Sequence, residues 1–548
     1  MDLDAGLKVS ARLKASRLTA LPVETLDKIA SCLYRPSQLN SLSRTCKQLN
    51  SAMQPRLYRE LSIVLPRHWS SAMFLEALLD SGAEGLQFTR SIIISMQNDE
   101  FGAPCESYDP EDDGLDFGDG GNWEDQDDDC GQRHYQPKVL NILLRLLISK
   151  VPNGCLQTFR WCHATRISRK TLELVARRHG HCLTTLQIYN ISPCTSEVDF
   201  SALTTLDAGG MYPYFALFWA SKSVASSHNS LTHLKLGCET FLAQSYLGRQ
   251  DSLTASEASD FTQDLDDGIR KSLPTQGSSK LDEQSSLRTS ILTLESLHLV
   301  GIDCGITPKI GAPTMLDIQK LTSLCLESCF NLRQGFPTLS PQRIPDAPPL
   351  LPQLRSFRLR QECSDASFQD GLKAFLLASK GLVHLAVLLE GSGPFLPPDC
   401  FVGNHGSTLR TLVWDQRQGA RTKLDESTNT ATAFMMSSSL DKIVENCPNL
   451  RELGLAVDAL TSGDHAHLYQ FSRFKYLKTL NIRNLPTQKA DAETSSFPTF
   501  HAMIAMDVAN ALLSYGSCLE TLGLGSTTWT DIWQGRSRDL SHRLAPGG

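Results

Sequence analysis

The chain has 548 residues, of which 41% are hydrophobic and 20% are charged, as is typical of soluble globular proteins. Its net charge of −7 argues against a nucleic-acid partner, which would call for a basic stripe. The 16 cysteines form no Cys-x-x-Cys pair, and no apolar run is long enough to span a membrane. We therefore expect a protein of a reducing compartment, cytoplasmic or nuclear, with neither a nucleic-acid nor a membrane partner.

Two apolar stripes at helical spacing follow a stretch, residues 1–17, that has little apolar pattern and that we expect to be a mobile leader. The first stripe is Leu26, Ile29, Ala30 and Leu33, and the second is Leu39, Leu42, Cys46 and Leu49. Pro36 and Pro55 interrupt the pattern. A helical unit of this size buries only a small core of its own, so it leaves apolar surface for something else to cover. A generic helical hairpin that caps a larger domain would fit the same pattern.

The order of these residues closely resembles an F-box. The resemblance rests on Leu21, Pro22, Glu24, Leu26 and Ile29, then Leu39, Leu42, Ser43, Cys46, Lys47 and Leu49, then Leu57 and Tyr58. Leu49 stands where the family usually has an aromatic residue. The resemblance implies a three-helix F-box over residues 18–61 that binds a Skp-type adaptor and, through it, a cullin. It implies that the adaptor interface or its immediate support consists of Leu21, Pro22, Leu26, Ile29, Leu42 and Cys46.

A strand is predicted over 61–65, a helix over 69–79 and a second strand over 91–95, an order that favours parallel pairing of the two strands. Residues 99–130 then hold 14 acidic residues and no Lys or Arg, so we expect a disordered insert at about 99–134. A calcium loop beginning at Asp109 is the alternative. It lacks the carboxylate required at its twelfth position, where Gly120 stands.

A Leu-x-x-Leu-x-Leu pattern that tolerates other apolar residues recurs 12 times in the rest of the chain. Its first leucines are Leu156, Leu183, Leu203, Leu231, Leu294, Leu321, Leu354, Leu382, Leu409, Leu450, Leu477 and Leu519. Six of the 11 spacings are 27 or 28 residues. Helices are predicted between these strands, at 168–180, 368–380, 437–446 and 503–514. One strand and one helix in each repeat resemble a leucine-rich-repeat solenoid. A doubly wound sheet is the alternative, but no glycine-rich phosphate turn follows any strand.

The predicted fold class is therefore α/β. An N-terminal three-helix F-box precedes a curved leucine-rich-repeat-like solenoid over 62–534, with a parallel sheet on one face and helices on the other. A second disordered insert is expected at about 245–290, a polar turn-like stretch at 415–430, and a frayed tail at 535–548.

No catalytic motif is found, so we expect a protein that is not an enzyme, with no catalytic residues, no cofactor and no metal site. His179 and His181 are interpreted as surface or cap histidines, and Cys325 and Cys329 as repeat residues. The predicted function is substrate recognition for a Skp–cullin–F-box ubiquitin ligase, with the solenoid binding a target protein whose identity the sequence does not reveal. The alternative is a ligase-independent interaction scaffold, and a hydrolase hidden in the repeats is a third hypothesis.

Target binding is predicted on the outward positions of the strands. Arg358 and Arg360 stand two apart on one predicted strand, so both should face the same side. Together they could bind a carboxylate or a phosphate of a target. The simpler interpretation is that they are solvated arginines that pair with Glu327 of the preceding strand.

Overall fold

The computed structural model describes 21 stretches of the chain. They are residues 18, 21–33, 35–65, 70–81, 84–96, 130–163, 166–189, 198–211, 223–224, 226–227, 230–238, 292–301, 316–329, 332, 351–361, 364–391, 396–418, 437–456, 466–483, 497–524 and 542–543. The predicted leader, the calcium loop and the insert at 245–290 lie outside them. The chain divides into two compact units: Met1–Leu231 with Asp264–Ser278, and Thr232–Gln263 with Ser279–Gly548.

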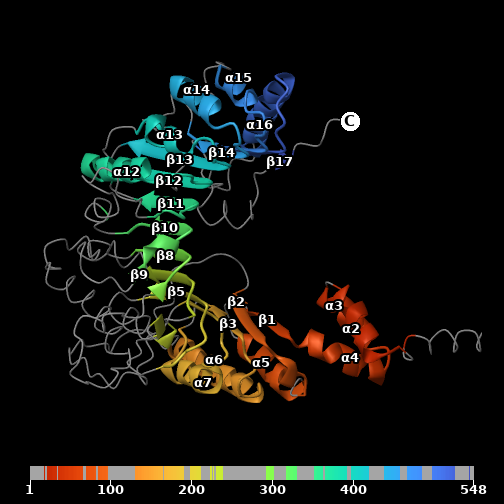
Figure 1. Cartoon of the computed structure of the whole chain (residues 1–548). Helices are drawn as coiled ribbons and strands as arrows, with labels where there is room; N and C mark the ends of the chain where they lie inside the picture. The colour runs from red at the N-terminus through yellow and green to blue at the C-terminus, as the bar shows by residue number, and fades with distance from the viewer. Residues whose placement is uncertain are drawn as a thin grey trace, which may run out of the picture. The chain divides into compact units, whose positions relative to one another are not determined.

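The first unit begins with three helices and continues into parallel strands (Figure 1). The helices are α2 (Val23–Ser31), α3 (Pro36–Ser43) and α4 (Lys47–Leu57). Five strands pair in chain order: β1 (Glu60–Leu65), β2 (Ser91–Met96), β3 (Thr158–Cys162), β4 (Thr185–Tyr189) and β5 (Thr205–Met211). Between them lie α5 (Ser70–Ser81), the 3-10 helix η1 (Gly85–Phe88), α6 (Cys130–Lys150) and α7 (Arg169–His179). The parallel pairing expected of the first two strands is confirmed, whereas α6 begins inside the range predicted as an insert.

The second unit contains nine described parallel strands, which also pair in chain order. They are β6 (His233–Cys238), β8 (Ser296–Val300), β10 (Ser323–Glu327), β11 (Ser356–Gln361), β12 (His384–Gly391), β13 (Thr411–Gln418), β14 (Glu452–Leu455), β15 (Thr479–Ile482) and β16 (Thr521–Leu524). The helices are α12 (Ala366–Ala378), α13 (Val402–His405), α14 (Ser437–Asn446), α15 (Ala466–Ser472) and α16 (Phe497–Ser514), with 3-10 turns η2 (Ile318–Lys320) and η3 (Pro398–Cys400). A separate small sheet pairs β7 (Leu292–Thr293) with β9 (Leu316–Asp317).

The leucine repeat sets where the strands begin. Twelve strands start two residues after the first leucine of their motif: β3 to β6, β8, and β10 to β16. All 12 of these leucines are at most 5% exposed. Equivalent positions are paired across neighbouring strands, as Ser296, Ser323 and Ser356 are. Because side chains alternate between the two faces of a strand, the repeat also fixes which residues share a face.

Two ring contacts join strands of the second unit to residues on or beside its helices. In the second unit the ring of Phe357 on β11 lies 4.8 Å from that of Phe375 on α12, measured between ring centroids. Phe401, beside α13, stacks on Trp414 of β13 at 4.9 Å. In the first unit α6 supplies a polar contact to the start of α7. Asn141 Oδ1 accepts hydrogen bonds from the Ser168 backbone N–H (2.8 Å) and the Thr171 hydroxyl (3.1 Å).

Two expectations about polar segments were wrong. The stretch from 415 was predicted as a turn-like loop, but β13 continues to Gln418, and the remainder of that stretch lies outside the described residues. The tail was expected to fray, but the two-residue strand β17 (His542–Arg543) pairs antiparallel with β16. Polar composition alone therefore did not identify the ends of the strands.

A buried ion cluster explains why β13 tolerates polar residues. Asp415 Oδ2 accepts hydrogen bonds from Arg417 Nη2 at 3.2 Å and from Arg483 Nε at 3.0 Å, and all three side chains are at most 2% exposed. Burial lowers the pKa of Arg483, whereas the neighbouring Asp415 carboxylate raises it. A buried charge is costly unless it is paired, so the three residues depend on one another.

Gly180 follows α7, and the reason for the glycine is close packing. Its backbone is helical, with φ −53°, rather than left-handed. A Cβ at this position would lie 2.6 Å from the carbonyl oxygen of Ala176 and closer still to that of Asp199. Both clashing atoms belong to the backbone, so a rotamer change of a neighbouring side chain cannot relieve the clash.

Changing Gly180 to Ala is expected to destabilise the protein by about 1–3 kcal/mol, because overpacking forces the backbone to shift. Gly403→Ala is the matched control, since no heavy atom lies within 4 Å of a Cβ there and alanine favours a helix. Denaturant unfolding of both variants measures the difference. Equal stabilities would contradict the close approach described for Gly180.

Candidate functional site

The three N-terminal helices enclose a small core of their own. It consists of the buried side chains of Leu26, Ala30, Leu39, Leu49 and Met53. Partly buried apolar residues surround it: Leu18, Leu21, Ile29, Leu33, Leu42, Cys46, Ala52 and Leu57. We call these partly buried residues the rim of the bundle. A closed core with a partly covered apolar rim is expected of a module that leaves surface for a partner.

The predicted adaptor-binding residues divide between this core and its rim. Leu26 lies inside the core, so it can only support an interface. The rim holds Leu21, Ile29, Leu42 and Cys46, and Pro22 is exposed immediately before α2, where its carbonyl accepts the N–H groups of the next helical turn. Val23, which is 63% exposed, lies beside Pro22 and falls outside the helical stripe.

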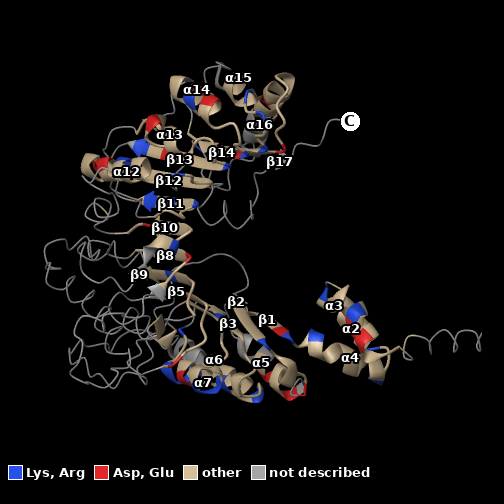
Figure 2. Ribbon diagram, in the orientation of Figure 1, with Lys and Arg blue, Asp and Glu red and all other residues tan. Residues whose placement is uncertain are grey.

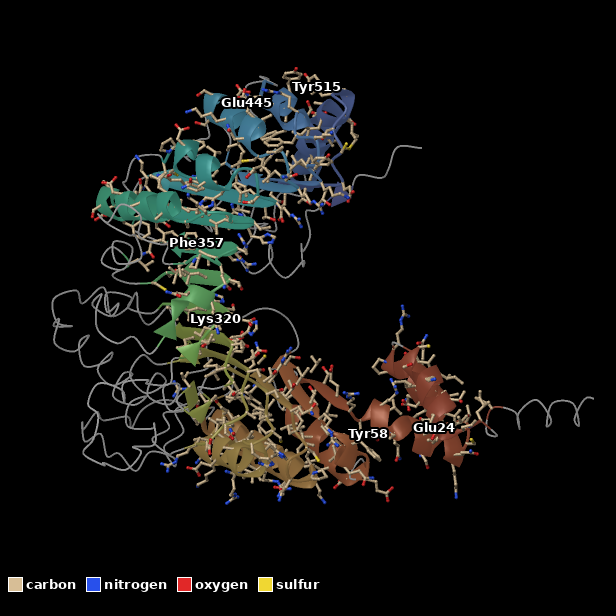
Figure 3. The ribbon with its side chains drawn as sticks, in the orientation of Figure 1. Glu24, Tyr58, Lys320, Phe357, Glu445 and Tyr515 are labelled. Carbon is tan, nitrogen blue, oxygen red and sulfur yellow. The ribbon has the colours of Figure 1, made fainter. Side chains whose placement is uncertain are left out.

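The bundle continues into the first strand almost directly. Two residues separate the end of α4 at Leu57 from the start of β1 at Glu60. One of them is Tyr58, labelled in Figure 3, whose ring packs on Gly85 so closely that a Cβ there would lie 2.5 Å from it. The carbonyl of the other, Arg59, accepts hydrogen bonds from the N–H groups of Arg90 and Ser91 at 2.9 and 3.0 Å. The junction is therefore packed and hydrogen-bonded.

Arg358 and Arg360 lie on the same face of β11, as predicted, and both are half-buried. Arg360 stands opposite Glu327 in the strand register, but both arginines are half-buried, whereas the simpler interpretation expected solvated side chains. Burial lowers the pKa of Arg358, while Cys325, Glu327 and Glu452 act in the opposite direction. The structure thus brings the two arginines together and surrounds them with carboxylates.

This face also carries apolar residues. Ala386, Leu388 and Val413 occupy outward positions on β12 and β13, yet together with Cys325 they form a buried apolar cluster. Glu452 lies on β14, two strands from β12. Burial raises the pKa of Glu452, whereas a hydrogen bond from Thr411 and the charge of Arg358 act to lower it. The arginines therefore adjoin an apolar cluster.

Charges elsewhere do not suggest a different type of site. Figure 2 shows Lys and Arg interspersed with Asp and Glu on the helices of both units. Of the two histidines interpreted as surface or cap residues, His181 is exposed, whereas His179 is buried at the C-terminal end of α7, directly before the C-cap residue Gly180. None of the described helices is long and apolar enough to cross a bilayer.

Comparison with known families identifies the N-terminal module. Residues 18–64 match the family described as F-box-like, a range that spans α2, α3, α4 and most of β1. The resemblance inferred from the sequence is therefore supported for this segment. No curated protein matches the chain.

Proposed function

We propose that this protein is a substrate-recognition subunit of a Skp–cullin–F-box type ubiquitin ligase. The observation that carries the proposal is an F-box-like domain followed, after a packed two-residue junction, by parallel strands in register. F-box domains bind Skp-type adaptors, which in turn connect to a cullin. The partly covered rim around Leu21, Ile29, Leu42 and Cys46 supports assigning the adaptor to this module.

The strands, we propose, form a curved leucine-rich-repeat-like solenoid with helices on its other face. Three observations support it: the recurrent spacing of 27 or 28 residues, the leucine rows in register, and the packing of Phe375 and Phe401 against strand residues. Stacked repeats provide one extended surface that contacts a partner at many points. In this scheme Arg358 and Arg360 belong to the target-binding face.

The mechanism is proximity. The F-box fixes the chain to the ligase while the repeats hold a target near the loaded ubiquitin carrier. Transfer then proceeds at a raised effective concentration, and no catalytic group is required of this chain. The protein acts as a receptor and not as an enzyme.

The double change Leu21→Ala, Pro22→Ala is expected to weaken binding of a purified Skp-type adaptor at least about tenfold. Burying one leucine side chain contributes about 1.5–3 kcal/mol, and the rim is where such burial remains available. Calorimetric titration of the full chain with the adaptor measures the effect. Leu26→Ala is unsuitable because it would empty the bundle core.

Leu377→Ala is the matched control, because Leu377 is an exposed leucine on α12, far outside the F-box sequence. Its affinity for the adaptor should equal that of the parent chain, and circular dichroism should show that all variants are folded. Unchanged affinity in the double variant would remove Leu21 and Pro22 from the interface. If the parent chain itself fails to bind the adaptor, the ligase-independent scaffold becomes the better explanation.

A further inference from the structure

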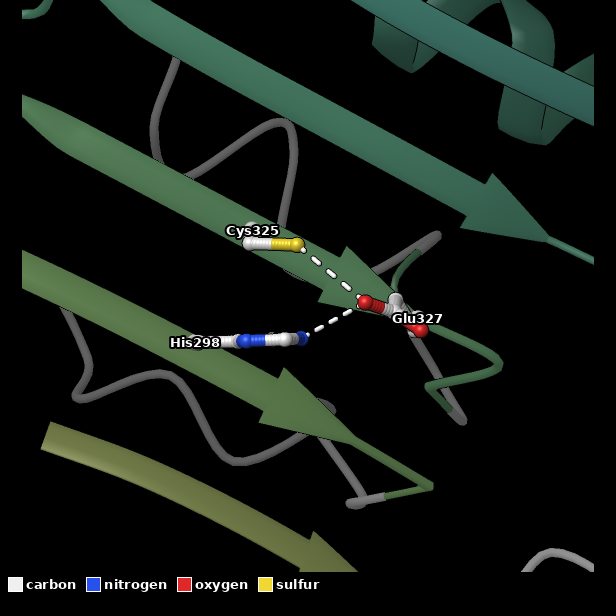
Figure 4. Close-up of side chains that lie close together, drawn as sticks. All are labelled: His298, Cys325 and Glu327. Carbon is white, nitrogen blue, oxygen red and sulfur yellow. Dashed lines mark hydrogen bonds and ion pairs between the residues drawn. The ribbon is translucent and has the colours of Figure 1, made fainter. Parts of the chain in front are cut away.

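Three side chains with metal-binding atoms meet on neighbouring strands of the second unit (Figure 4). His298 lies on β8, and Cys325 and Glu327 lie on β10, where Cys325 is paired with His298 in the strand register. Glu327 Oε1 lies 2.7 Å from His298 Nε2 and 3.5 Å from Cys325 Sγ. The three ligand atoms all lie within 4.8 Å of one another.

The three groups are the types that zinc prefers. Imidazole nitrogen, thiolate sulfur and carboxylate oxygen bind Zn²⁺ at about 2.0–2.3 Å, so tetrahedral ligand atoms stand roughly 3.3–3.7 Å apart. The distance between Cys325 Sγ and Glu327 Oε1 already falls in that range. His298 Nε2 and Glu327 Oε1 would have to move apart by less than about 1 Å to reach it. Small side-chain rotations on two hydrogen-bonded strands would provide it.

The cluster is enclosed but reachable. Cys325 is 5% exposed, and the side chains of His298 and Glu327 are 25% and 15% exposed. We propose that His298, Cys325 and Glu327 form a binding site for a divalent cation of the zinc type, with water in the remaining position. A bound ion would link β8 to β10 through their side chains.

The charges at the site are compatible with a divalent ion. A thiolate and a carboxylate together offset its two positive charges, although Arg358, opposite Cys325 on β11, adds one more. Burial raises the pKa of the Cys325 thiol, so the thiol is protonated without metal and donates to Glu327. Binding replaces the S–H bond by a metal–sulfur bond and releases that proton. Imidazole binds through Nε2, so the proton that Nε2 donates to Glu327 is lost from Nε2, and one proton remains on Nδ1.

The competing explanation is an ion pair between His298 and Glu327 that the thiol merely adjoins. It accounts for the same distances without any metal. The two explanations differ in what happens when an ion is offered, because only a metal site requires all three side chains together.

The test uses the full chain, freed of metal by a chelator and titrated with Zn²⁺ in competition with a chromophoric chelator. Titration with Co²⁺ reports thiolate binding through near-ultraviolet charge-transfer absorption. We expect His298→Ala, Cys325→Ser and Glu327→Gln each to weaken Zn²⁺ binding more than about tenfold. Even the loss of a residue that only hydrogen-bonds to a metal ligand typically lowers metal affinity by this factor. Cys325→Ser should also abolish the absorption.

Cys518→Ser and His181→Ala are matched controls, since they remove an exposed thiol and an exposed imidazole. Both should bind like the parent chain, and Zn²⁺ should raise the melting temperature of the parent and of these controls only. If Cys325→Ser fails to fold, the other two variants carry the test, because their side chains are partly exposed. Equal affinities in the parent, His298→Ala and Glu327→Gln would overturn the proposal and leave the ion pair. Adaptor binding is independent of either result.

Discussion

Asp415→Asn is expected to destabilise the protein by about 3–5 kcal/mol, because it removes the carboxylate to which two buried guanidinium groups donate. Arg483 is fully buried, and losing its counterion leaves a charge in a medium that solvates it poorly. The amide has nearly the same shape as the carboxylate, so the change tests charge rather than packing. Denaturant unfolding of the full chain measures it.

Asp399→Asn is the matched control, since Asp399 pairs with Lys442 at 2.7 Å but on the exposed surface. Such a pair contributes at most about 1 kcal/mol, so this variant should unfold nearly like the parent. Replacing Asp415, Arg417 and Arg483 together with Leu, Met and Met should recover much of the lost stability, because no uncompensated charge then remains. If Asp415→Asn unfolds like Asp399→Asn, the cluster does not stabilise this unit.

The first unit is expected to lose stability in mild acid. Burial lowers the pKa of both His163 and His179 to about 4, whereas an unfolded histidine titrates at about 6.5. Between these values the unfolded chain binds protons that the folded chain does not, so the free energy of unfolding falls as the pH drops through this window. The loss should reach about 2 kcal/mol per histidine at pH 5.

Unfolding of the parent and of His163→Gln, His179→Gln at pH 7.5, 6.5, 5.5 and 5 measures this dependence. The double variant should show a flatter profile, because both acid-sensitive groups are gone, even if its stability at pH 7.5 is lower. His233→Gln, which changes an exposed histidine of the second unit, should keep the slope of the parent. A double variant with the same slope as the parent would mean that these histidines protonate as readily folded as unfolded.

The array of strands could be predicted because one physical requirement recurs along the chain. Each of the 12 repeat strands follows a buried leucine, and most of them bury apolar residues at alternate positions, so the sequence pattern and the register have the same cause. The F-box-like helices were recognisable for a similar reason, since four of the five core residues, Leu26, Ala30, Leu39 and Leu49, belong to the two stripes, whose other members lie around the core.

Where polar residues are buried, the pattern gave the wrong answer. Asp415 and Arg417 look like a loop because their partner, Arg483, lies 66 or more residues away and a local window cannot contain it. Asn141 appears to interrupt an apolar run, yet it holds the start of α7. His179 resembles a surface residue by its neighbours, but its own side chain is buried at the end of α7, where Arg177 is exposed.

The cluster on β8 and β10 left a signal that the sequence analysis did not use. His298 and Cys325 are 27 residues apart, which is the repeat spacing, so the repeat alone aligns them on adjacent strands. Glu327, two residues further, must then share their face. The earlier interpretation compared Cys325 only with Cys329, whose thiol instead points to the backbone carbonyls of Leu299 and Glu327.

The antiparallel strand β17 has a consequence for how molecules of this protein meet one another. A row of parallel strands ends in an edge whose free N–H and C=O groups invite a strand from another chain, the first step toward aggregation. On β16 that edge is occupied at Thr521 and Leu522, which pair with Arg543 and His542. A second molecule must displace this short strand before it can pair with β16 at these two positions, so β17 protects part of this edge from the addition of another strand.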